Sequence, residues 1–151
     1  MTTVSDILRT KDTRIITVRL RETVATAVKL MERENIAALV VKDVSRTEGN
    51  IVVGVFSERD VARALAAHGA QALDMPIASL IKRPLAQCTE RDTLDTVLAL
   101  MDKHQVRMLP VMEEHTLIGV ISISDIIKHS VAQSVGAAAR DAGHGATALH
   151  A

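Results

Sequence analysis

Apolar residues along the chain follow two different spacings, and each spacing predicts a different element. In one segment they stand three and four positions apart, which is typical of the buried face of an amphipathic helix: Val24, Ala27, Val28 and Met31. Short β-rich apolar runs at 15–18, 37–41 and 51–56 lie before and after this helix, with polar loops between them. A second helix is predicted to begin at Ser57. The predicted order is therefore β-α-β-β-α.

The same order recurs in the second half of the chain. Displacing the sequence by 70 positions aligns Thr23, a predicted helix cap, with Thr93, and the match continues without gaps through the following strand. The loop at 45–50 then lengthens the first copy, so the displacement falls to 65 and Asp60 aligns with Asp125. The second copy predicts strands and helices at matching places: strands at 85–88, 108–112 and 117–121, and helices beginning near 94 and 122.

Two such copies are expected to pack together, because a unit of about 60 residues buries too little surface to form an adequate core alone. We expect an α+β fold of the α/β-sandwich type, in which two three-stranded sheets lie face to face with the helices outside. A pseudo-two-fold arrangement would leave two equivalent clefts between the copies. Short leading helices are predicted at 3–8 and 77–81. The predicted division is 1–70 for the first repeat with its leading helix, 71–133 for the second repeat, and 134–151 for a flexible tail.

Composition narrows the classes of function. The 18 basic and 18 acidic residues cancel, and Phe56 is the sole aromatic side chain, which argues against nucleic acid and against anionic membrane surfaces as partners. The longest apolar run, 36–41, is far shorter than the roughly 20 residues of a membrane-spanning helix, and the first 20 residues lack the apolar core of a secretory signal. A single cysteine, Cys88, forms no internal disulfide, so we expect the reducing cytoplasm.

The most informative local pattern occurs where a predicted strand becomes a helix. It reads Gly-Val-Phe-Ser-Glu-Arg-Asp at 54–60 and Gly-Val-Ile-Ser-Ile-Ser-Asp at 119–125. The open N–H groups at the helix start and the serine hydroxyl can hold a phosphate, the aspartate can accept hydrogen bonds from ribose, and the glycine leaves room for a ligand. The same Ser-x-x-Asp spacing is also an ordinary capping box, and the spacing by itself favours this second interpretation.

Together with the Thr-capped helices and the Leu-Pro-Val strand at 109–111, these motifs resemble the cystathionine β-synthase (CBS) domain, which occurs in pairs. The resemblance covers roughly residues 4–132 and is to small stand-alone bacterial CBS-pair proteins. It implies a regulatory module without catalysis or a catalytic cofactor, whose clefts bind an adenosine-containing ligand such as AMP, ADP, ATP, NAD or S-adenosylmethionine. It also implies a homodimer that relays a conformational signal to an effector protein yet to be identified.

The resemblance also implies which residues bind the ligand. Asp60 and Asp125 would hold ribose hydroxyls. The others are a serine in each copy, two arginines that meet phosphate, residues that surround adenine, and a lysine: Lys11, Ile16, Thr17, Ile36, Ala37, Val55, Ser57, Arg59, Ala86, Val106, Arg107, Met108, Val120, Ile121 and Ser122. Met108 stands where many relatives carry histidine, and Arg59 aligns with Ser124. We therefore expect the two clefts to bind an anionic nucleotide unequally.

Other chemistries have weaker support in the sequence. The six histidines show no paired spacing typical of a metal site. Cys88 aligns with Val18 at an inward strand position, which indicates a small buried hydrophobic residue rather than a nucleophile. No base and nucleophile stand out from the repeat as a catalytic set. The main alternative to a ligand sensor is a homodimeric interaction scaffold that binds no physiological nucleotide.

Overall fold

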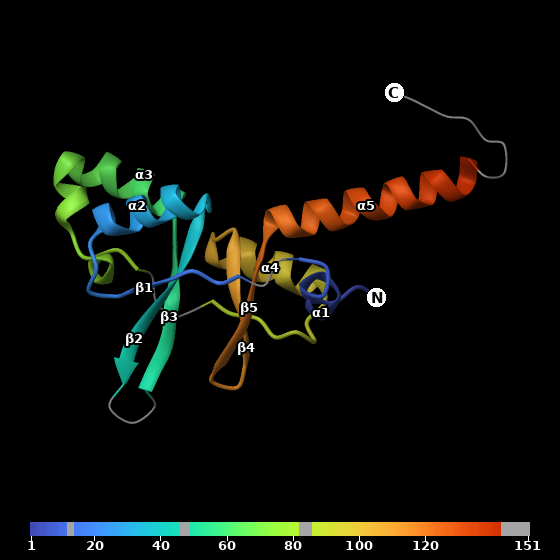
Figure 1. Ribbon diagram of the computed structural model, residues 1–151, viewed down its shortest axis with the longest axis horizontal. Helices are drawn as coiled ribbons and strands as arrows, with labels where there is room; N and C mark the ends of the chain where they lie inside the picture. The colour runs from blue at the N-terminus through green and yellow to red at the C-terminus, as the bar shows by residue number, and fades with distance from the viewer. Residues whose placement is uncertain (12–13, 46–48, 82–85, 143–151) are drawn as a thin grey trace.

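The computed structural model of the chain describes residues 1–11, 14–45, 49–81 and 86–142 (Figure 1). Helices and strands follow in the order α1 (Val4–Leu8), β1 (Thr17–Arg19), α2 (Val24–Glu34), β2 (Ala38–Ser45), β3 (Gly49–Ser57), α3 (Glu58–His68), the 3-10 helices η1 (Gly69–Asp74) and η2 (Ile77–Ser79), α4 (Leu94–His104), β4 (Met108–Glu113), β5 (Thr116–Ser122) and α5 (Ile123–Ala142). The fold is α+β, as predicted, and the order helix, strand, strand, helix that follows β1 recurs in the second copy as α4, β4, β5 and α5.

The strands of the two copies form separate small sheets. In the first copy β1 pairs in parallel with β2, and β2 pairs antiparallel with β3. In the second copy β4 and β5 form an antiparallel pair. Strands β3 and β4 lie beside each other where the sheets meet, while α2 and α3 cover the first sheet and α5 runs outward from the end of β5 (Figure 1).

The prediction of a third strand in the second sheet is wrong within the described residues, where Cys88 makes a single parallel bridge to β4. The first copy shows why. There, the N–H of Val40 donates to the carbonyl of Ile16 at 3.1 Å. The second copy has Pro110 at the position that matches Val40, and proline has no N–H to donate. The pairing consists of two hydrogen bonds made by Cys88. Its N–H donates to the carbonyl of Pro110, and its carbonyl accepts from the N–H of Met112.

Matching caps delimit the first long helix of each copy. The hydroxyl of Thr23 accepts a hydrogen bond from the N–H of Thr26 at 3.3 Å, and Thr93 caps α4 in the same way. Both helices end at a residue in the left-handed conformation, Asn35 or Gln105. The threonine caps predicted from the sequence are therefore confirmed.

The leading segments pack across the repeat. Helix α1 precedes the first copy in sequence, yet its Val4 and Ile7 are buried in the core of the second copy, whereas Ile77 of η2 is buried in the core of the first. The two leading segments make matching main-chain hydrogen bonds. The N–H of Val4 donates to the carbonyl of Asp92 at 2.9 Å, and the N–H of Ile77 donates to the carbonyl of Glu22 at 2.8 Å. Grouping the leading helix with the first repeat therefore describes the order of the sequence and not the packing.

Helix α5 is longer than predicted. It continues to Ala142, whereas we expected a flexible tail from residue 134. The sequence at 137–139 is three consecutive alanines, and alanine has the highest intrinsic helix propensity. The structure therefore has a helix at 134–142 where a tail was expected, the flexibility of this segment stays a prediction, and residues 143–151 lie outside the described residues.

Candidate ligand site

The Ser-x-x-Asp motif of the first copy forms a capping box at the start of α3. The carboxylate oxygen Oδ2 of Asp60 accepts from the N–H of Ser57 at 2.8 Å and from its hydroxyl at 2.9 Å, while the N–H of Asp60 donates to that hydroxyl at 3.3 Å. The other carboxylate oxygen, Oδ1, lies 3.9 Å from a guanidinium nitrogen of Arg63. The capping interpretation is therefore confirmed here.

The motif of the second copy has the same reciprocal pair and one additional partner. Oδ2 of Asp125 accepts from the N–H of Ser122 at 2.9 Å, and the N–H of Asp125 donates to the Ser122 hydroxyl at 3.2 Å. Lys11 follows α1 and reaches this motif from the leading segment that packs on the second copy. Its ammonium donates to Asp125 Oδ2 at 2.8 Å and to the main-chain carbonyl of Val120 at 2.9 Å. The two side chains of this ion pair are only 23% and 15% exposed.

The environment of Asp125 keeps its carboxylate ionised. Burial raises the pKa, but the hydrogen bond from Lys11, the N–H of Ser122 and the positive charge of Lys11 together outweigh burial, so the pKa lies below its usual value. Two donors occupy Oδ2, and no group in the described part of the chain donates to Oδ1. The site therefore offers a charged acceptor that is held in position and whose second oxygen has no partner among the described residues.

The first N–H groups of the motif helices are largely occupied. The N–H of Glu58 donates to the carbonyl of Ala37, and the N–H of Ile123 donates to the carbonyl of Arg107, both at 3.0 Å. These bonds bring the start of the second strand of each copy next to the motif of the same copy. These hydrogen bonds, together with those to the capping serines, use most of the N–H donors that were predicted to bind a phosphate. A bound phosphate would therefore contact mainly side chains.

The motif glycines leave space for side chains of the leading segments and not for a ligand. A Cβ atom at Gly54 would lie 3.1 Å from Cδ1 of Ile81, and one at Gly119 would lie 3.0 Å from Cδ2 of Leu8. Each glycine thus admits an aliphatic side chain that follows or ends a leading helix. The predicted role of glycine as space beside the strand for a ligand is wrong, and Leu8 and Ile81 were missed because their contacts are distant in sequence.

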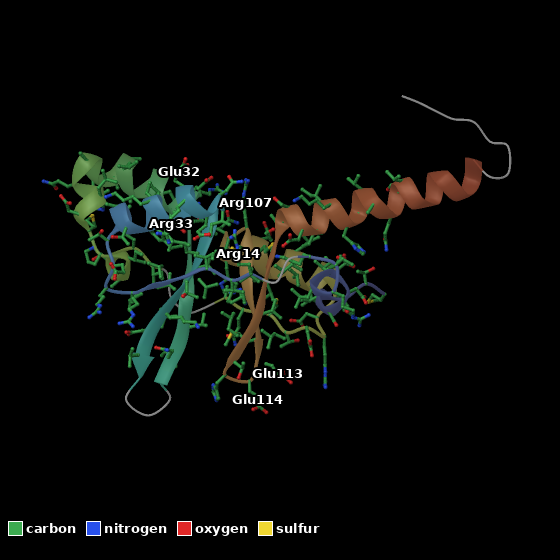
Figure 2. The ribbon with its side chains drawn as sticks, viewed as in Figure 1. Arg14, Glu32, Arg33, Arg107, Glu113 and Glu114 are labelled. Carbon is green, nitrogen blue, oxygen red and sulfur yellow. The ribbon has the colours of Figure 1, made fainter. Side chains whose placement is uncertain are left out.

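The remaining predicted residues differ in exposure. Those with half-buried side chains are Ile16, Ile36, Val55, Ala86, Val106, Met108 and Val120. Those with exposed side chains are Thr17, Ala37, Arg59 and Arg107. Ile121 is fully buried in the core of the second copy, so its side chain is unavailable to a ligand. In the view of Figure 2, Arg107 lies in the middle of the molecule, between α2 and α5.

A cavity of about 340 Å³ lies between α2 and α3 and adjoins the first-copy motif. Ile36 and Ala37 line it together with Glu58 and Val61, so the structure does bring two predicted residues to one hollow. Its remaining walls are mostly residues of α2, which places it towards the helical face of the molecule.

Metal and thiol chemistry have no support among the described residues. No group of three or more histidine, cysteine, aspartate or glutamate side chains is gathered there in a way that could hold a metal ion. Cys88 is buried, as predicted, and burial together with the charge of Asp92 raises the pKa of its thiol to about 12. A protonated thiol is a poor nucleophile. In that same part of the chain, no helix is both long enough and apolar enough to cross a membrane.

The fold and the two capped motifs define a class of protein, a tandem pair of small α+β modules whose two cores each include a leading segment from the other half of the sequence. The sequence profile of the CBS domain matches residues 3–67 and 77–132. The chain therefore belongs to the CBS domain family, and the resemblance drawn from the motifs is confirmed.

The similarity to known proteins covers most of the chain. It is 26% identical to the CBS domain-containing protein YhcV of Bacillus subtilis over 141 residues, which is 93% of this chain and 96% of that protein. A putative signal-transduction protein with CBS domains from Burkholderia ambifaria is similar in structure, with a TM-score of 0.75 and 31% identity over 87% of this chain and 95% of its own. The CBS domain pair of protein MJ0100, solved in complex with 5′-methylthioadenosine and S-adenosyl-L-methionine, shares the fold at a TM-score of 0.71 and 23% identity, over 88% and 98% of the two chains.

Proposed function

We propose that this CBS pair is a sensor that binds an adenosine-containing nucleotide between its copies and relays the resulting change in shape to a partner protein. The observation that carries the proposal is the Lys11–Asp125 pair, which holds an ionised carboxylate and an ammonium group that are 114 positions apart in the sequence in direct contact. The AMP, ADP, ATP and NAD type of ligand fits this pair, because ribose offers hydroxyl donors and phosphate offers acceptors. The adenosine ligands of the MJ0100 pair support the same class.

The two side chains of the pair would bind different parts of the ligand. Oδ1 of Asp125 would accept from a ribose hydroxyl, while Oδ2 stays bound to Lys11 and Ser122. An ammonium group has three N–H donors, and two of those on Lys11 are used by Asp125 and Val120. The third would donate to a phosphate oxygen of the ligand. The half-buried side chains of Ile16 and Val106 would pack against adenine in place of an aromatic ring.

The two clefts would bind the ligand unequally. Among the described residues no lysine binds the capped oxygen of Asp60, and the ion pair that they give it is with Arg63, which is 41% exposed and 3.9 Å away. An exposed pair at that distance stabilises little. We therefore assign the tighter binding of an anionic nucleotide to the Asp125 cleft, with Asp60 serving a weaker or uncharged ligand.

The relay would follow from the position of Lys11. A ligand that engages Lys11 and Asp125 together with Ile16 of the first copy favours whichever arrangement of the copies lets it make all these contacts, and it shifts the population accordingly. The outer helices would transmit this change, because they expose apolar side chains that a second copy of the chain can cover: Val28, Leu65, Leu98 and Ile127. We expect a homodimer, in the reducing cytoplasm that a single unpaired thiol suits.

The test is a thermal melt with a dye reporter against AMP, ADP, ATP, NAD and S-adenosylmethionine. At a concentration of 100 times the dissociation constant, a ligand stabilises the native state by about 2.7 kcal/mol, which raises the midpoint by several degrees. Asp125→Ala should abolish the shift and Asp60→Ala should leave most of it. Asp102→Ala, an exposed carboxylate on α4, is the matched control and should change nothing.

The same exposed helices favour a second candidate, a homodimeric interaction scaffold whose clefts stay empty. A protein that melts cooperatively and shifts with none of the five ligands would support the scaffold and refute the sensor. Light scattering at micromolar concentration tests the assembly, and a mass of one chain would contradict the homodimer.

A further inference from the structure

A larger cavity, of about 590 Å³, lies away from both capped motifs. It is bounded by β1, the turn that follows it and the far part of the β2–β3 hairpin. In that hairpin, Ser57 pairs with Ala38 at one end, whereas the cavity is lined by Val44 and Asn50, which pair near the other end. Of the residues predicted to bind the nucleotide, Thr17 is the one that lines it. Its volume is within the range of small-molecule sites.

Among the described residues, three cations line this cavity, namely Arg19, Arg21 and Lys42. The parallel register places Arg19 directly opposite Lys42 on the neighbouring strand. Like charges in that position repel each other and destabilise a sheet. None of the three forms an ion pair with a residue of the described chain, so a repulsion remains that a bound anion would relieve.

The second copy shows that the fold does not require these charges. At the positions that match Arg19 and Lys42 it has Thr89 and Met112, and only Arg91 keeps the charge of Arg21. The segment around Cys88 runs parallel to the following strand as β1 does, although it makes a single bridge where β1 pairs over three residues. The cationic cluster is therefore a property of the first copy alone and has no structural role that the repeat shares.

The other walls indicate what an anionic ligand would carry besides its charge. Glu22 and Asp43 also line the cavity, and carboxylates accept hydrogen bonds from hydroxyl groups. One oxygen of Asp43 already accepts from the N–H of Val44 at 2.8 Å. Val18 and Leu20 supply an apolar surface. A ligand with a phosphate at one end and several hydroxyls on a carbon chain or ring would satisfy both kinds of charge.

We propose that this cavity binds a phosphorylated polyhydroxy compound, such as a sugar phosphate, at a site separate from the nucleotide clefts. The two guanidinium groups and the ammonium group hold the phosphate, with arginine providing paired N–H donors that match phosphate oxygens. The two carboxylates receive the hydroxyls. The site would let one small module respond to a second metabolite in addition to its nucleotide.

Titration calorimetry with glucose 6-phosphate tests the site directly. The key variant, R19T/K42M, gives the first copy the residues that the second copy carries, so it changes the charge in a way that the fold already tolerates. It should weaken binding by about ten-fold or more, because it removes two charged donors to the phosphate. K103T/K128M removes two exposed lysines on α4 and α5, neither of which lines the cavity, and is the matched control, which should bind as the unaltered protein does.

Amide chemical shifts provide a readout that does not depend on any variant. Adding glucose 6-phosphate to the unaltered protein should move the amides of residues 19–22 and 42–44, and should do so equally in D60A/D125A, whose nucleotide clefts are disabled. Glucose alone should cause smaller changes. The proposal is overturned if millimolar glucose 6-phosphate moves none of these amides, or if the control variant loses as much affinity as R19T/K42M.

Discussion

Replacing Lys11 with methionine removes an ammonium group, keeps most of the aliphatic stem, and leaves the carboxylate of Asp125 without its nearest cation. The pair is not fully exposed, since its side chains are 23% and 15% accessible, and it is not fully buried either. Exposed ion pairs contribute about 0–1 kcal/mol, whereas removing one partner from a buried pair costs about 3–5 kcal/mol. We expect a loss of about 2 kcal/mol near neutral pH, which lowers the melting midpoint by about 4–8 °C for a chain of this length.

The dependence on pH identifies the carboxylate as the cause. The folded-state pKa of Asp125 lies below its usual value, so the pair stabilises the native state above the unfolded pKa and loses that contribution as the pH falls through the folded pKa. Without Lys11, burial acts on the carboxylate with fewer opposing interactions and the pKa rises. The difference in stability between the unaltered protein and Lys11→Met should therefore be complete near neutral pH and should shrink in acid.

Urea unfolding at several pH values measures this difference. Lys29→Met is the control, because Lys29 is an exposed lysine of α2 that forms no ion pair within the described chain. Two results would refute the reasoning. One is a Lys11→Met protein as stable as Lys29→Met near neutral pH, and the other is a difference that persists undiminished in acid.

Three further substitutions test the packing. Pro110→Val supplies an N–H that can donate to the Ala86 carbonyl, so the new amide should be protected from hydrogen exchange, and rapid exchange would contradict the explanation of the short second sheet. Gly119→Ala places a Cβ 3.0 Å from Leu8 and should destabilise the protein by about 1 kcal/mol or more, with a smaller cost when Leu8 is alanine as well. Ile7→Ala should cost about 2–5 kcal/mol in urea unfolding although Ile7 lies in a five-residue helix, and a loss near zero would mean that α1 contributes little to the second core.

Local patterns predicted most of the fold. The three-and-four spacing of Val24 and Met31 and the capping role of Thr23 depend on residues within a few positions of each other, and both are confirmed. Pro110 shows a signal that was present but not used, since a proline in a strand removes a donor whatever surrounds it. The exchange of the leading segments could not be predicted in this way, because burial of Ile7 in the second core leaves no trace in the spacing of its neighbours.

In the candidate site, too, contacts between residues close in sequence could be predicted and contacts between distant residues could not. Ser57 and Asp60 are three positions apart, so the capping box could be predicted from spacing. Lys11 and Asp125 are 114 positions apart, and only the resemblance to the family indicated that both belong to a site. The contact of Gly119 with Leu8 depends on where a distant helix packs, which explains why a ligand was assigned to space that a side chain fills.

The exchange of leading segments also determines how the protein comes apart. Unfolding the first copy alone would pull on α1, whose Val4 and Ile7 fill the second core, and unfolding the second would release Ile77 from the first. Neither half can melt while the other keeps an intact interior, so the duplicated chain behaves as one cooperative unit. A half-length chain would lack the segment that its core needs, and two such halves could complete each other only by swapping their leading segments as a dimer.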